Sequence, residues 1–427
     1  MKFSFSWLKD YLETDLSADE VGDILTDTGL EVESLIDPRK RLGQLSVGEI
    51  LKVEKHPNAD KLKVCEVKSS TGILNIVCGA PNVKSGMKVV VAKPGDFIPG
   101  LNVNLKASKI RDVKSEGMMC SERELEISDE HDGIIELPSN TEVGTLFSEL
   151  VGDEKTVFEI AITPNRPDAL GIYGIARDLS ASGIGKLRVS KIPNVEGTFK
   201  PHLNINLDQA VSSKECPLFV GRYLRSVQNR ESPRWLKDRL ASIGLNPISA
   251  LVDITNYLTF DRGRPLHVFD ADKLSGSITV RRSFKGEKFH ALDDKIYELN
   301  EGMIVITDEK EIVSLGGIIG GMKSAVSDET KNVLLEAAYF DPISIAATGR
   351  KLQINSDARY RFERGVDPSF TLSGSHIATK MILDLCGGEA SDIIIAGSVP
   401  SFKKKIILDP KKINHLIGIQ VNTGRQI

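Results

Sequence analysis

The sequence predicts a multidomain α/β (α+β) protein in which a small β-barrel is inserted near the N-terminus, ahead of a large mixed α/β region. Three observations carry this prediction. The chain has 427 residues, which is too many for one ordinary core. Short strand-like runs fill residues 39–151, and a longer mixture of strand and helix patterns fills residues 200–398. The change of pattern between them indicates separate domains.

Residues 1–38 and 152–190 are expected to form one discontinuous α/β domain on the two sides of the barrel. The first segment has the pattern of a strand followed by helices, with Ser17 capping a helix that Gly29 ends. The second has a Pro-rich start and then a helix with its isoleucines and a leucine on one face. Neither segment is large enough to bury a core alone, so each is predicted to complete the other.

The barrel prediction rests on short runs separated by turn residues. The runs VGEILKVEKHP, KLKVCEVKS, LNIVCGAPN and MKVVVAKPG are strand-like and are split by Gly, Pro and Asn. Regular short strands with turn signals are typical of a small β-barrel. Residues 39–151 are therefore assigned to it.

The remainder divides into one large domain and a short tail. Residues 200–398 begin with LNINLD, whose apolar residues alternate as in a half-buried strand, and continue as mixed strands and helices. Farther on, Asp409 caps a helix that starts with Pro410. Residues 399–427 are too few for a domain, so they are expected to be the start of a truncated following domain.

Composition excludes several classes of function. The net charge of -4 gives the chain no general attraction for nucleic acid, so any RNA contact has to come from local basic patches. The five cysteines include no CxxC pair, which argues against a disulfide framework and against a zinc site. No stretch is long and apolar enough for a membrane span, and the start lacks the features of a signal peptide. A cytoplasmic protein is therefore expected.

Three motifs in the barrel segment carry a resemblance to a known module. They are HPNADKL at residues 56–62, CGAPNV at 78–83 and SKIRDVKSEGMMCSERELEI at 108–127. In this order they resemble the tRNA-binding module of free-standing tRNA-binding proteins and of some tRNA synthetases, which is an OB-fold barrel. The resemblance implies phosphate contacts by basic side chains. The candidates are Lys52, Lys55, Lys61, Lys63, Lys106, Lys109, Arg111 and Lys114. Acidic residues stand among them, so an ordinary solvated face is the alternative.

A second ordered set of motifs occupies residues 246–368. It consists of NPISALVDITNY, GRPLHVFD, SLGGIIGG, LEAAYFDP and ARYRFERGVDP. Together with TPNRPD, these motifs resemble the β subunits of bacterial phenylalanyl-tRNA synthetases over essentially the whole chain. The resemblance implies the tRNA(Phe)-binding and proofreading part of an α2β2 ligase whose α subunit activates phenylalanine. ATP and Mg²⁺ are implied for that full enzyme, while no cofactor and no metal site are expected in this part.

The resemblance also implies a pocket that separates tyrosine from phenylalanine. The two differ by one hydroxyl, which an apolar activation pocket cannot strongly reject, so a second site has to sort the charged products. A carboxylate at Glu336 would accept a hydrogen bond from the phenol and would be left unpaired beside phenylalanine. His267 would orient or deprotonate the water that hydrolyses the ester, and Thr255 and Asn256 would hold the substrate or that water. The other expected pocket positions are Pro265, Gly317 and Ala358.

Each of these features also has an ordinary structural interpretation. His267 can be a satisfied structural histidine, and Glu336 can complement the dipole of a helix that begins there. The glycines of GGIIGG can form a tight turn, since no Lys-Ser or Lys-Thr pair follows them. The charges within residues 358–365 can form a salt-bridged surface or can meet RNA phosphate.

One residue departs from the family pattern. The family commonly has a basic residue where this chain has Asn246, which puts a contact with the substrate or the tRNA end there in question. Two other functions stay open on sequence alone. One is an autonomous hydrolase that clears mischarged tRNA in trans, and the other is a non-catalytic RNA-binding or assembly protein.

Overall fold

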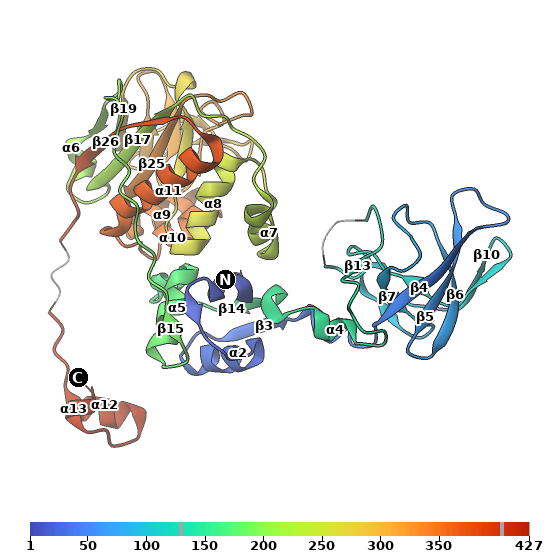
Figure 1. Ribbon diagram of the computed structural model, residues 1–427. Coiled ribbons are helices and arrows are strands. Elements are labelled where there is room, and N and C mark those ends of the chain that lie inside the picture. Colours follow the sequence, from blue (N-terminus) through green and yellow to red (C-terminus); the bar gives the residue numbers. More distant parts are fainter. Residues whose placement is uncertain (128–130, 402–404, 427) are drawn as a thin grey trace.

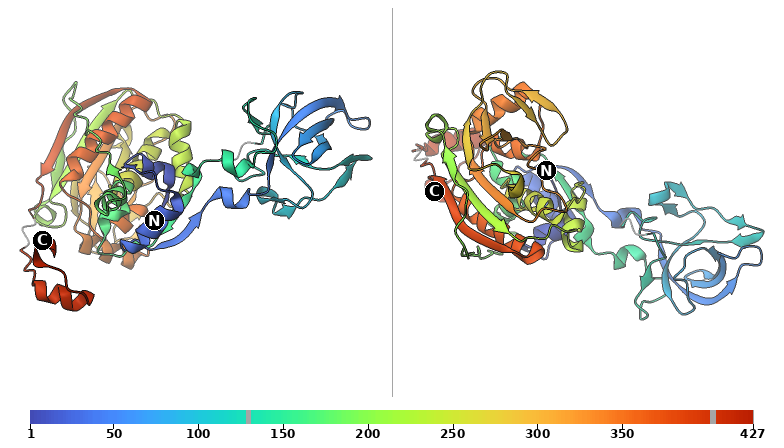
Figure 2. Two further views of the ribbon diagram at one scale, coloured as in Figure 1. Left: turned by 60° about the horizontal axis from the view of Figure 1, so that its bottom comes forward. Right: turned by 90° about the horizontal axis from the view of Figure 1, so that it is seen from above.

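The chain folds into several bodies of mixed secondary structure. The computed structural model describes residues 1–127, 131–401 and 405–426. Figure 1 shows a large α/β body, a small α/β unit below it, and a strand-rich body extended to one side. Both views of Figure 2 show a narrow connection between the strand-rich body and the rest. The predicted multidomain mixed α/β architecture is therefore confirmed. No helix within the described ranges is long and apolar enough to cross a membrane.

Both flanks of the strand-rich body contribute to the small unit. Its main sheet has the order β1-β14-β3, so a strand from residues 157–160 lies between two strands from the first 36 residues. Ser17 caps α2 through a capping box with Glu20, and Gly29 follows the helix at a φ of 89°. The elements are β1 (Lys2–Ser4), α1 (Phe5–Lys9), β2 (Leu12–Glu13), α2 (Ala18–Asp27), β3 (Val32–Ile36), β14 (Val157–Ile160), η3 (Pro167–Leu170), α5 (Ile172–Ala181) and β15 (Lys186–Leu187).

The strand-rich body is built on an antiparallel sheet with the order β12-β7-β4-β5-β6, and β13 also pairs with β7. Alternate residues of β7 enter two different apolar clusters, so this strand is buried on both faces. Among the described residues the pairing does not close into a barrel, and the OB-fold stays a prediction. The elements are α3 (Pro38–Arg41), β4 (Ser46–Lys55), β5 (Lys63–Ser69), β6 (Gly72–Cys78), β7 (Lys88–Ala92), β8 (Phe97–Ile98), η1 (Pro99–Leu101), β9 (Val103–Asn104), β10 (Ser108–Ile110), β11 (Val113–Ser115), β12 (Met118–Met119), β13 (Glu136–Leu137), α4 (Phe147–Leu150) and η2 (Asp153–Lys155).

The large body contains two sheets and several helices. An antiparallel sheet with the order β18-β25-β17-β26 shares a core with the sheet β16-β19-β22-β23-β24, and helices α8 and α11 cover the other face of the first sheet (Figure 1). The strands are β16 (Ile205–Leu207), β17 (Leu218–Arg225), β18 (His267–Asp270), β19 (Ile278–Arg282), β20 (Lys288–His290), β21 (Ile296–Glu298), β22 (Ile304–Thr307), β23 (Ile312–Leu315), β24 (Ile319–Gly320), β25 (Val333–Tyr339) and β26 (Glu389–Gly397). The helices are α6 (Gln209–Ser212), α7 (Arg234–Ser242), α8 (Ala250–Arg262), η4 (Ala271–Lys273), α9 (Pro342–Leu352), α10 (Asp357–Phe362) and α11 (Phe370–Cys386).

Buried polar contacts fasten the small unit to the large body. Trp7 Nε1 donates to Asp261 Oδ1 of helix α8 at 2.8 Å, and the Tyr11 hydroxyl donates to Oδ2 at 2.7 Å. Arg361 of helix α10 donates through Nε to the Leu170 carbonyl at 3.2 Å. All three donor side chains are buried, so water does not compete for these bonds.

The tail after β26 carries two further helices, α12 (Pro410–Ile417) and α13 (Thr423–Gln426). Asp409 caps α12 by accepting a hydrogen bond from the Lys411 backbone N–H at 3.0 Å, and Pro410 occupies the first turn. The helix start was predicted at this position from the same two residues.

Candidate functional site

His267 and Glu336 occupy directly opposed positions on neighbouring strands. Strand β18 pairs with β25 in antiparallel register, and His267 is the partner of Glu336. Directly opposed residues point to the same face of a sheet, with their Cβ atoms about 5 Å apart. Phe269 and Leu334, two positions away on each strand, belong to the core between the two sheets. The carboxyl and the imidazole therefore lie on the inner face of the large body.

Both side chains carry a buried polar atom without a partner. Glu336 is only 6% exposed, and its Oε2 has no hydrogen-bond partner among the described residues. His267 is partly exposed as a whole, but its Nε2 is buried and equally unpartnered within the same set. An unpaired buried polar group costs about 1–3 kcal/mol. Two of them on adjacent strands indicate a place where a polar ligand can bind.

Burial shifts the protonation of the two groups in opposite directions. It lowers the pKa of the His267 imidazole to about 4, so the ring is neutral at pH 7. It raises the pKa of the Glu336 carboxyl to about 8, and the Arg264 guanidinium partly opposes that rise. At neutral pH the site therefore holds a neutral imidazole and a mostly protonated carboxyl. A protonated carboxyl can both donate to and accept from a hydroxyl group.

Glutamate 336 does not start a helix. It lies in the middle of strand β25, and the helix that follows begins at Pro342 with Asp341 as its cap. The interpretation of Glu336 as a complement to a helix dipole is therefore wrong. The reason is that the LEAAYF run continues as a buried central strand, and only the Asp-Pro pair after it starts the helix.

Gly316 and Gly317 of SLGGIIGG form the turn between β23 and β24, as the tight-turn interpretation expected, whereas Gly320 lies in β24. Gly317 has a φ of 67°, in the left-handed region that favours glycine. A Cβ at this position would be 2.8 Å from Phe340 Cδ2, and the rings of Phe340 and Phe362 pack edge to face at 5.3 Å. A Cβ at Gly320 would be 2.4 Å from His267 Cε1. The turn therefore packs against the rings of Phe340 and Phe362, and strand β24 packs against the imidazole.

Helix α10 brings Ala358 to the same turn. Ser356 accepts a hydrogen bond from the Arg359 backbone N–H at 3.0 Å, and its hydroxyl donates to the Ile318 carbonyl at 2.7 Å. Ala358 packs at the margin of the core that contains Phe362. Sequence reasoning missed Ser356, although a serine directly before an acidic helix start is a capping signal.

Thr255 and Asn256 lie on helix α8 (Ala250–Arg262). Helix α8 packs on the outer face of the four-stranded sheet, where Ile254 shares a core with Leu335. Thr255 Oγ1 donates to the Val252 carbonyl at 2.7 Å within its own helix. The contacts of the described residues include none between either side chain and His267 or Glu336, so the roles of Thr255 and Asn256 stay predictions.

Pro265 ends the ladder between β18 and β25. Continuing the register past His267 sets Pro265 opposite Ala338, and proline has no N–H to donate to that carbonyl. Arg264 supplies the donor instead, because its Nη2 bonds to the Ala338 carbonyl and also to Thr371 Oγ1 at 2.8 Å. Sequence reasoning did not single out Arg264. Its signal is a charged residue three positions before a mostly buried strand.

The basic candidates for RNA contact lie on the strand-rich body. Seven of them are exposed: Lys52, Lys55, Lys61, Lys106, Lys109, Arg111 and Lys114. Lys63 differs, because it is partly buried and its Nζ donates to the Val83 carbonyl at 3.2 Å. Lys52 and Lys114 each form an ion pair at 2.7 Å, with Glu54 and Glu116. The seven exposed side chains are accessible to a polyanion. Two of them, however, are paired with acidic neighbours, as expected for an ordinary solvated face.

The HPNADKL motif supports the hairpin formed by β10 and β11. His56 Nδ1 accepts from the Asn58 backbone N–H at 3.1 Å, so the ring proton lies on Nε2, which donates to the Ile110 carbonyl at 3.0 Å. Asn58 Nδ2 donates to the Arg111 carbonyl at 3.3 Å. Two motifs far apart in sequence are therefore one structural unit, with the first holding the tip of the second.

Comparison with known proteins matches both parts of this arrangement. The family described as "Putative tRNA binding domain" matches residues 45–146, and the family described as "B3/4 domain" matches residues 215–387. The phenylalanine–tRNA ligase β subunit of Ruegeria pomeroyi is 52% identical over 431 residues, which cover 100% of this chain and 54% of the relative. The chain belongs to the phenylalanine–tRNA ligase β-subunit family.

Other relatives agree with this membership. The β subunit of Paramagnetospirillum magneticum is 52% identical over 426 residues, covering 100% of this chain and 53% of the relative. The chain thus spans about half the length of the curated β subunits it matches. A solved N-terminal fragment of the β subunit from Pyrococcus horikoshii has 17% identity and a TM-score of 0.31, covering 63% of this chain and 74% of the fragment. That structural likeness is too low to carry an argument.

The arginine cluster within residues 358–365 is paired internally. Arg359 Nε donates to Glu363 Oε2 at 3.0 Å, and Arg364 Nη1 donates to Glu363 Oε1 at 2.9 Å. Arg361 is buried and donates to Asp357 Oδ1 at 3.1 Å. Of the two interpretations left open for these charges, the salt-bridged one fits the structure.

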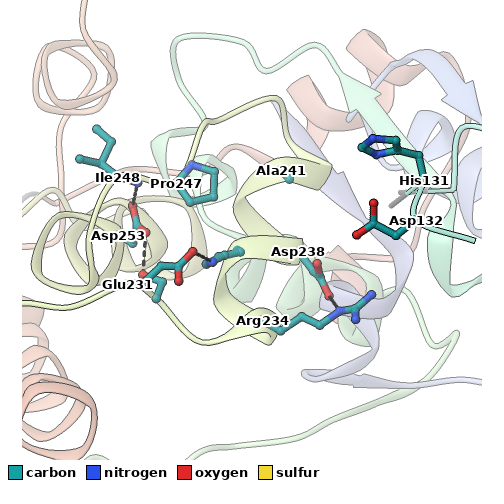
Figure 3. A pocket seen from close by; sticks show the side chains of 11 residues that line it. His131, Asp132, Glu231, Arg234, Asp238, Ala241, Pro247, Ile248 and Asp253 are labelled. Carbon is teal, nitrogen blue, oxygen red and sulfur yellow. Dashed lines mark hydrogen bonds and ion pairs between the residues drawn. The ribbon is translucent and has the colours of Figure 1, made fainter. Parts of the chain in front are cut away.

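A cavity of about 730 Å³ lies elsewhere in the molecule, between helix α7 and residues 131–132 of the strand-rich body (Figure 3). At its base, Asp253 accepts from Ser232 Oγ at 2.6 Å and from the Ile248 backbone N–H at 2.9 Å. Asn246, the departure from the family pattern, is exposed and lies one residue before Pro247, which lines this cavity. Neither His267 nor Glu336 lines it, so it is separate from the candidate site.

Cysteines and metal ligands add nothing to the site in the part of the chain that is described. All five cysteines are buried and unpaired. Burial and the nearby Glu336 charge raise the pKa of the Cys216 thiol. The described residues contain no group of three or more His, Cys, Asp and Glu side chains placed to hold a metal ion.

Proposed function

We propose that this chain is the tRNA-binding and proofreading part of a phenylalanine–tRNA ligase β subunit, and that it hydrolyses mischarged Tyr-tRNA(Phe). One observation carries the proposal. His267 and Glu336 face each other on the inner side of the large body, each with a buried polar atom that lacks a partner. Membership of the β-subunit family supplies the substrate class, because the relatives are named for charging tRNA with phenylalanine.

Glu336 is the proposed reader of the tyrosine hydroxyl. A phenolic O–H would give Oε2 the hydrogen bond that it lacks, whereas the ring edge of phenylalanine would leave this buried oxygen unpaired. A difference of about 1–3 kcal/mol corresponds to a preference for tyrosine of roughly 5- to 150-fold. Gly317 and Ala358 keep the positions beside the aromatic ring that the family resemblance implies, and both lie next to the core that contains Phe340 and Phe362.

His267 is the proposed residue that acts on the attacking water. Its pKa near 4 makes the neutral ring a weak base at pH 7, so the histidine is proposed to orient the water by a hydrogen bond to Nε2. Backbone N–H groups of the glycine turn are the proposed donors to the tetrahedral oxyanion. Thr255, Asn256 and Pro265 keep the pocket positions implied by the family resemblance.

The exposed basic side chains of the strand-rich body are the proposed contacts to tRNA(Phe). They are Lys52, Lys55, Lys61, Lys106, Lys109, Arg111 and Lys114, and each would meet the phosphate backbone. The match of residues 45–146 to a tRNA-binding family supports this assignment. Such contacts place the tRNA without reading its sequence.

The full ligase is a wider proposal. A catalytic α subunit is proposed as the partner in an α2β2 enzyme that joins phenylalanine to tRNA(Phe) with ATP and Mg²⁺ in the cytoplasm. Phenylalanine activation is assigned to that partner. The fragment itself is proposed to act on the ester bond of aminoacyl-tRNA and to need no cofactor of its own.

Deacylation assays test the proposal directly. Purified chain is incubated with Tyr-tRNA(Phe) and Phe-tRNA(Phe), with and without added α subunit. His267→Ala is expected to lower the tyrosine rate at least tenfold, and Glu336→Ala is expected to abolish the preference for tyrosine. His290→Ala and Glu301→Ala, which change exposed residues of the same body, are the matched controls. A tyrosine preference that survives Glu336→Ala would remove Glu336 from the role of hydroxyl reader.

The same assay separates the rival functions. Hydrolysis by the chain alone supports an autonomous trans-acting hydrolase. Hydrolysis that appears only with the α subunit supports a subunit of the ligase. If tRNA binds but no ester is cleaved under either condition, the chain is a binding or assembly module and the hydrolytic proposal is wrong.

A further inference from the structure

The backbone N–H of Gly320 points away from the strand that β24 pairs with. Gly320 lies opposite Ser314 in the antiparallel pair of β24 with β23. The ladder bond on this side is made by the next residue, because the Gly321 N–H donates to the Val313 carbonyl at 2.8 Å. In an antiparallel pair the residue beside a bonded one directs both its N–H and its carbonyl to the opposite edge. Both groups of Gly320 therefore face away from β23.

On that opposite edge the carbonyl of Gly320 is bonded and its N–H is not. The carbonyl accepts from the Leu292 backbone N–H at 3.0 Å, and the neighbouring Met322 N–H donates to the His290 carbonyl at 3.0 Å. Gly320 is buried, yet its own N–H makes no hydrogen bond within residues 1–127, 131–401 and 405–426. Buried N–H groups without a partner are rare in folded proteins. This N–H is therefore available to a ligand.

The free N–H lies close to the unpartnered nitrogen of His267. An ideal Cβ at Gly320 would be 2.7 Å from His267 Nε2. Since a backbone nitrogen is about 2.5 Å from the Cβ position of its own residue, the two nitrogens are no more than about 5 Å apart. Leu292 Cδ1 would be 3.0 Å from the same Cβ, and this leucine is 42% exposed. The two nitrogens therefore lie beside an apolar side chain that borders on solvent.

The turn before β24 offers fewer free donors near the imidazole. The N–H groups of Gly316 and Ile318 each donate to a backbone carbonyl at 3.0 Å. The N–H of Gly317 makes no bond in the described part of the chain, but the atom nearest to a Cβ at Gly317 belongs to Phe340. Gly320 thus combines a free N–H with direct proximity to His267.

We propose that the Gly320 backbone N–H is the principal donor to the oxyanion formed during hydrolysis of aminoacyl-tRNA, which makes Gly320 a catalytic residue through its main chain. The inference rests on the proposed function and assigns one atom within it. Nitrogens this close can reach two oxygens attached to one carbon, so His267 Nε2 holds the water while the Gly320 N–H faces the carbonyl oxygen.

The N–H of Gly320 acts on charge that exists only during the reaction. The water oxygen bonds to the ester carbon, and the electron pair of the carbonyl moves to the carbonyl oxygen. Return of that pair expels the ribose oxygen, which takes one proton of the water. A hydrogen bond to the carbonyl oxygen strengthens while the charge is present, so it lowers the barrier more than it stabilises the bound substrate.

Replacing the amide by an ester tests this N–H without adding a side chain. Gly320→glycolate in the otherwise unchanged chain removes the N–H and keeps the length of the backbone. The kcat for hydrolysis of Tyr-tRNA(Phe) is expected to fall about 100- to 1000-fold with little change in KM. An unchanged kcat, or a loss that appears only as a higher KM, overturns the proposal.

Two further esters are the matched controls. Gly321→glycolate removes the N–H that bonds to Val313, so it weakens the same strand and is expected to lower stability while keeping most of kcat. Gly43→glycolate, at an exposed position of the strand-rich body, is expected to change neither. Equal losses of kcat at positions 320 and 321 would mean that β24 matters only for the fold, which overturns the proposal.

A second measurement uses the unmodified backbone and covers an ester variant that does not fold. The chain, labelled with ¹⁵N-glycine, is titrated with a phosphonate ester of adenosine that carries a hydroxyphenyl side chain and mimics the tetrahedral oxyanion. The Gly320 amide proton, assigned by its absence in Gly320→Ala, is expected to move downfield because it gains a hydrogen bond to a charged oxygen. The Gly43 signal is expected to stay in place. A Gly320 signal that does not move when the phosphonate is bound overturns the proposal.

The outcomes separate this inference from the proposed function. If the parent chain cleaves no aminoacyl-tRNA and does not bind the phosphonate, the proposed function fails and the inference fails with it. If the parent cleaves Tyr-tRNA(Phe) and Gly320→glycolate keeps the full kcat, only the assignment of the donor fails.

Discussion

Lys109 and Lys114 lie directly opposite each other across hairpin β10–β11. Like charges in opposed cross-strand positions repel each other. The turn between them places Arg111 at a φ of 46° and Asp112 at a φ of 73°, a conformation that usually selects Asn-Gly. The hairpin therefore holds Lys109, Arg111 and Lys114 close together, although their charges repel each other and the turn conformation is unfavourable for its residues.

This arrangement predicts a trade between stability and RNA affinity. Replacing Lys109 and Lys114 by alanine removes the repulsion, so the free energy of unfolding is expected to stay equal or rise slightly. The affinity for tRNA is expected to fall about tenfold or more, and the salt dependence to become shallower by about two phosphate contacts. Filter binding at several salt concentrations measures both, with Lys84→Ala as an exposed control on the same body. An unchanged salt slope would count against phosphate contact by this hairpin.

His56 provides an indirect test of the same hairpin. The residue is 5% exposed, and its bonds to Ile110 and Asn58 hold the tip in place. His56→Ala is expected to lower the free energy of unfolding by about 1–3 kcal/mol and to weaken tRNA binding, although the ring contacts no RNA. Urea unfolding and binding assays measure the two effects. Loss of stability with full RNA affinity would mean that the tip does not take part in binding.

A side chain at Gly320 would collide with the His267 imidazole, so substitution there tests whether the position of the ring matters. A Cβ at this position would lie 2.4 Å from His267 Cε1, so Gly320→Ala is expected to displace the ring. The rate of Tyr-tRNA(Phe) hydrolysis should fall at least tenfold with little change in tRNA affinity. Gly43→Ala is the matched control, because no atom lies within 4 Å of its added Cβ. Full activity in Gly320→Ala would show that the ring position is not important for the reaction.

The raised pKa of Glu336 predicts a pH-dependent stability. In the folded chain the carboxyl keeps its proton up to about pH 8, whereas in the unfolded chain it loses the proton near its ordinary pKa of 4.5. Its contribution to the free energy of unfolding is therefore complete below pH 4.5 and falls as the pH rises to 8. Glu336→Gln is expected to be more stable than the parent at pH 9, by on the order of 3 kcal/mol, and similar at pH 4.5.

The lowered pKa of His267 acts in the opposite sense and has to be separated from this effect. Its contribution increases between pH 4 and 6.5, because the unfolded imidazole binds a proton that the folded one does not. Unfolding measurements above pH 6.5 therefore isolate Glu336. Parallel stability curves for the parent and Glu336→Gln between pH 6.5 and 9 would contradict the buried-acid assignment.

Replacement of Asp261, which accepts hydrogen bonds from two buried donors, is expected to lower the stability of the fold strongly. Asp261→Ala would leave the buried N–H of Trp7 and the buried hydroxyl of Tyr11 without their acceptor. The free energy of unfolding is expected to fall by about 3 kcal/mol, measured by urea or heat. Tyr11→Phe removes one donor together with its need for a partner, so it should lose only about 1 kcal/mol. Equal losses in the two variants would show that the shared acceptor is unimportant.

Local features of the fold could be predicted because their causes are local. The Ser17 capping box, the Asp409 and Pro410 helix start, and the glycine turn at residue 317 each depend on neighbouring residues only. The strand position of Glu336 was not predicted. A short apolar run such as LEAAYF fits a strand or a buried helix equally well until its long-range pairing is known.

The candidate site depends on pairings that no local pattern contains. His267 meets Glu336 through strand register across 69 residues, and the family resemblance, not residue spacing, brought the two together. The packing of helix α8, which carries Thr255, on the outer face of the sheet is likewise not described by a sequence motif. Arg264 was not singled out because its bonds to the Ala338 carbonyl and to Thr371 join segments far apart in the sequence.

The sheet order β1-β14-β3 has a consequence for synthesis. The middle strand of this sheet is made more than 120 residues after the strand on either side, so β1 and β3 emerge from the ribosome without a partner. At about 5–20 residues per second, the wait lasts on the order of 6–25 s. The intervening strand-rich body has all its pairing partners within its own segment and can fold during that time. During this time the apolar side chains of Phe3 and Phe5 stay exposed, so the N-terminus of the nascent chain is expected to bind chaperones.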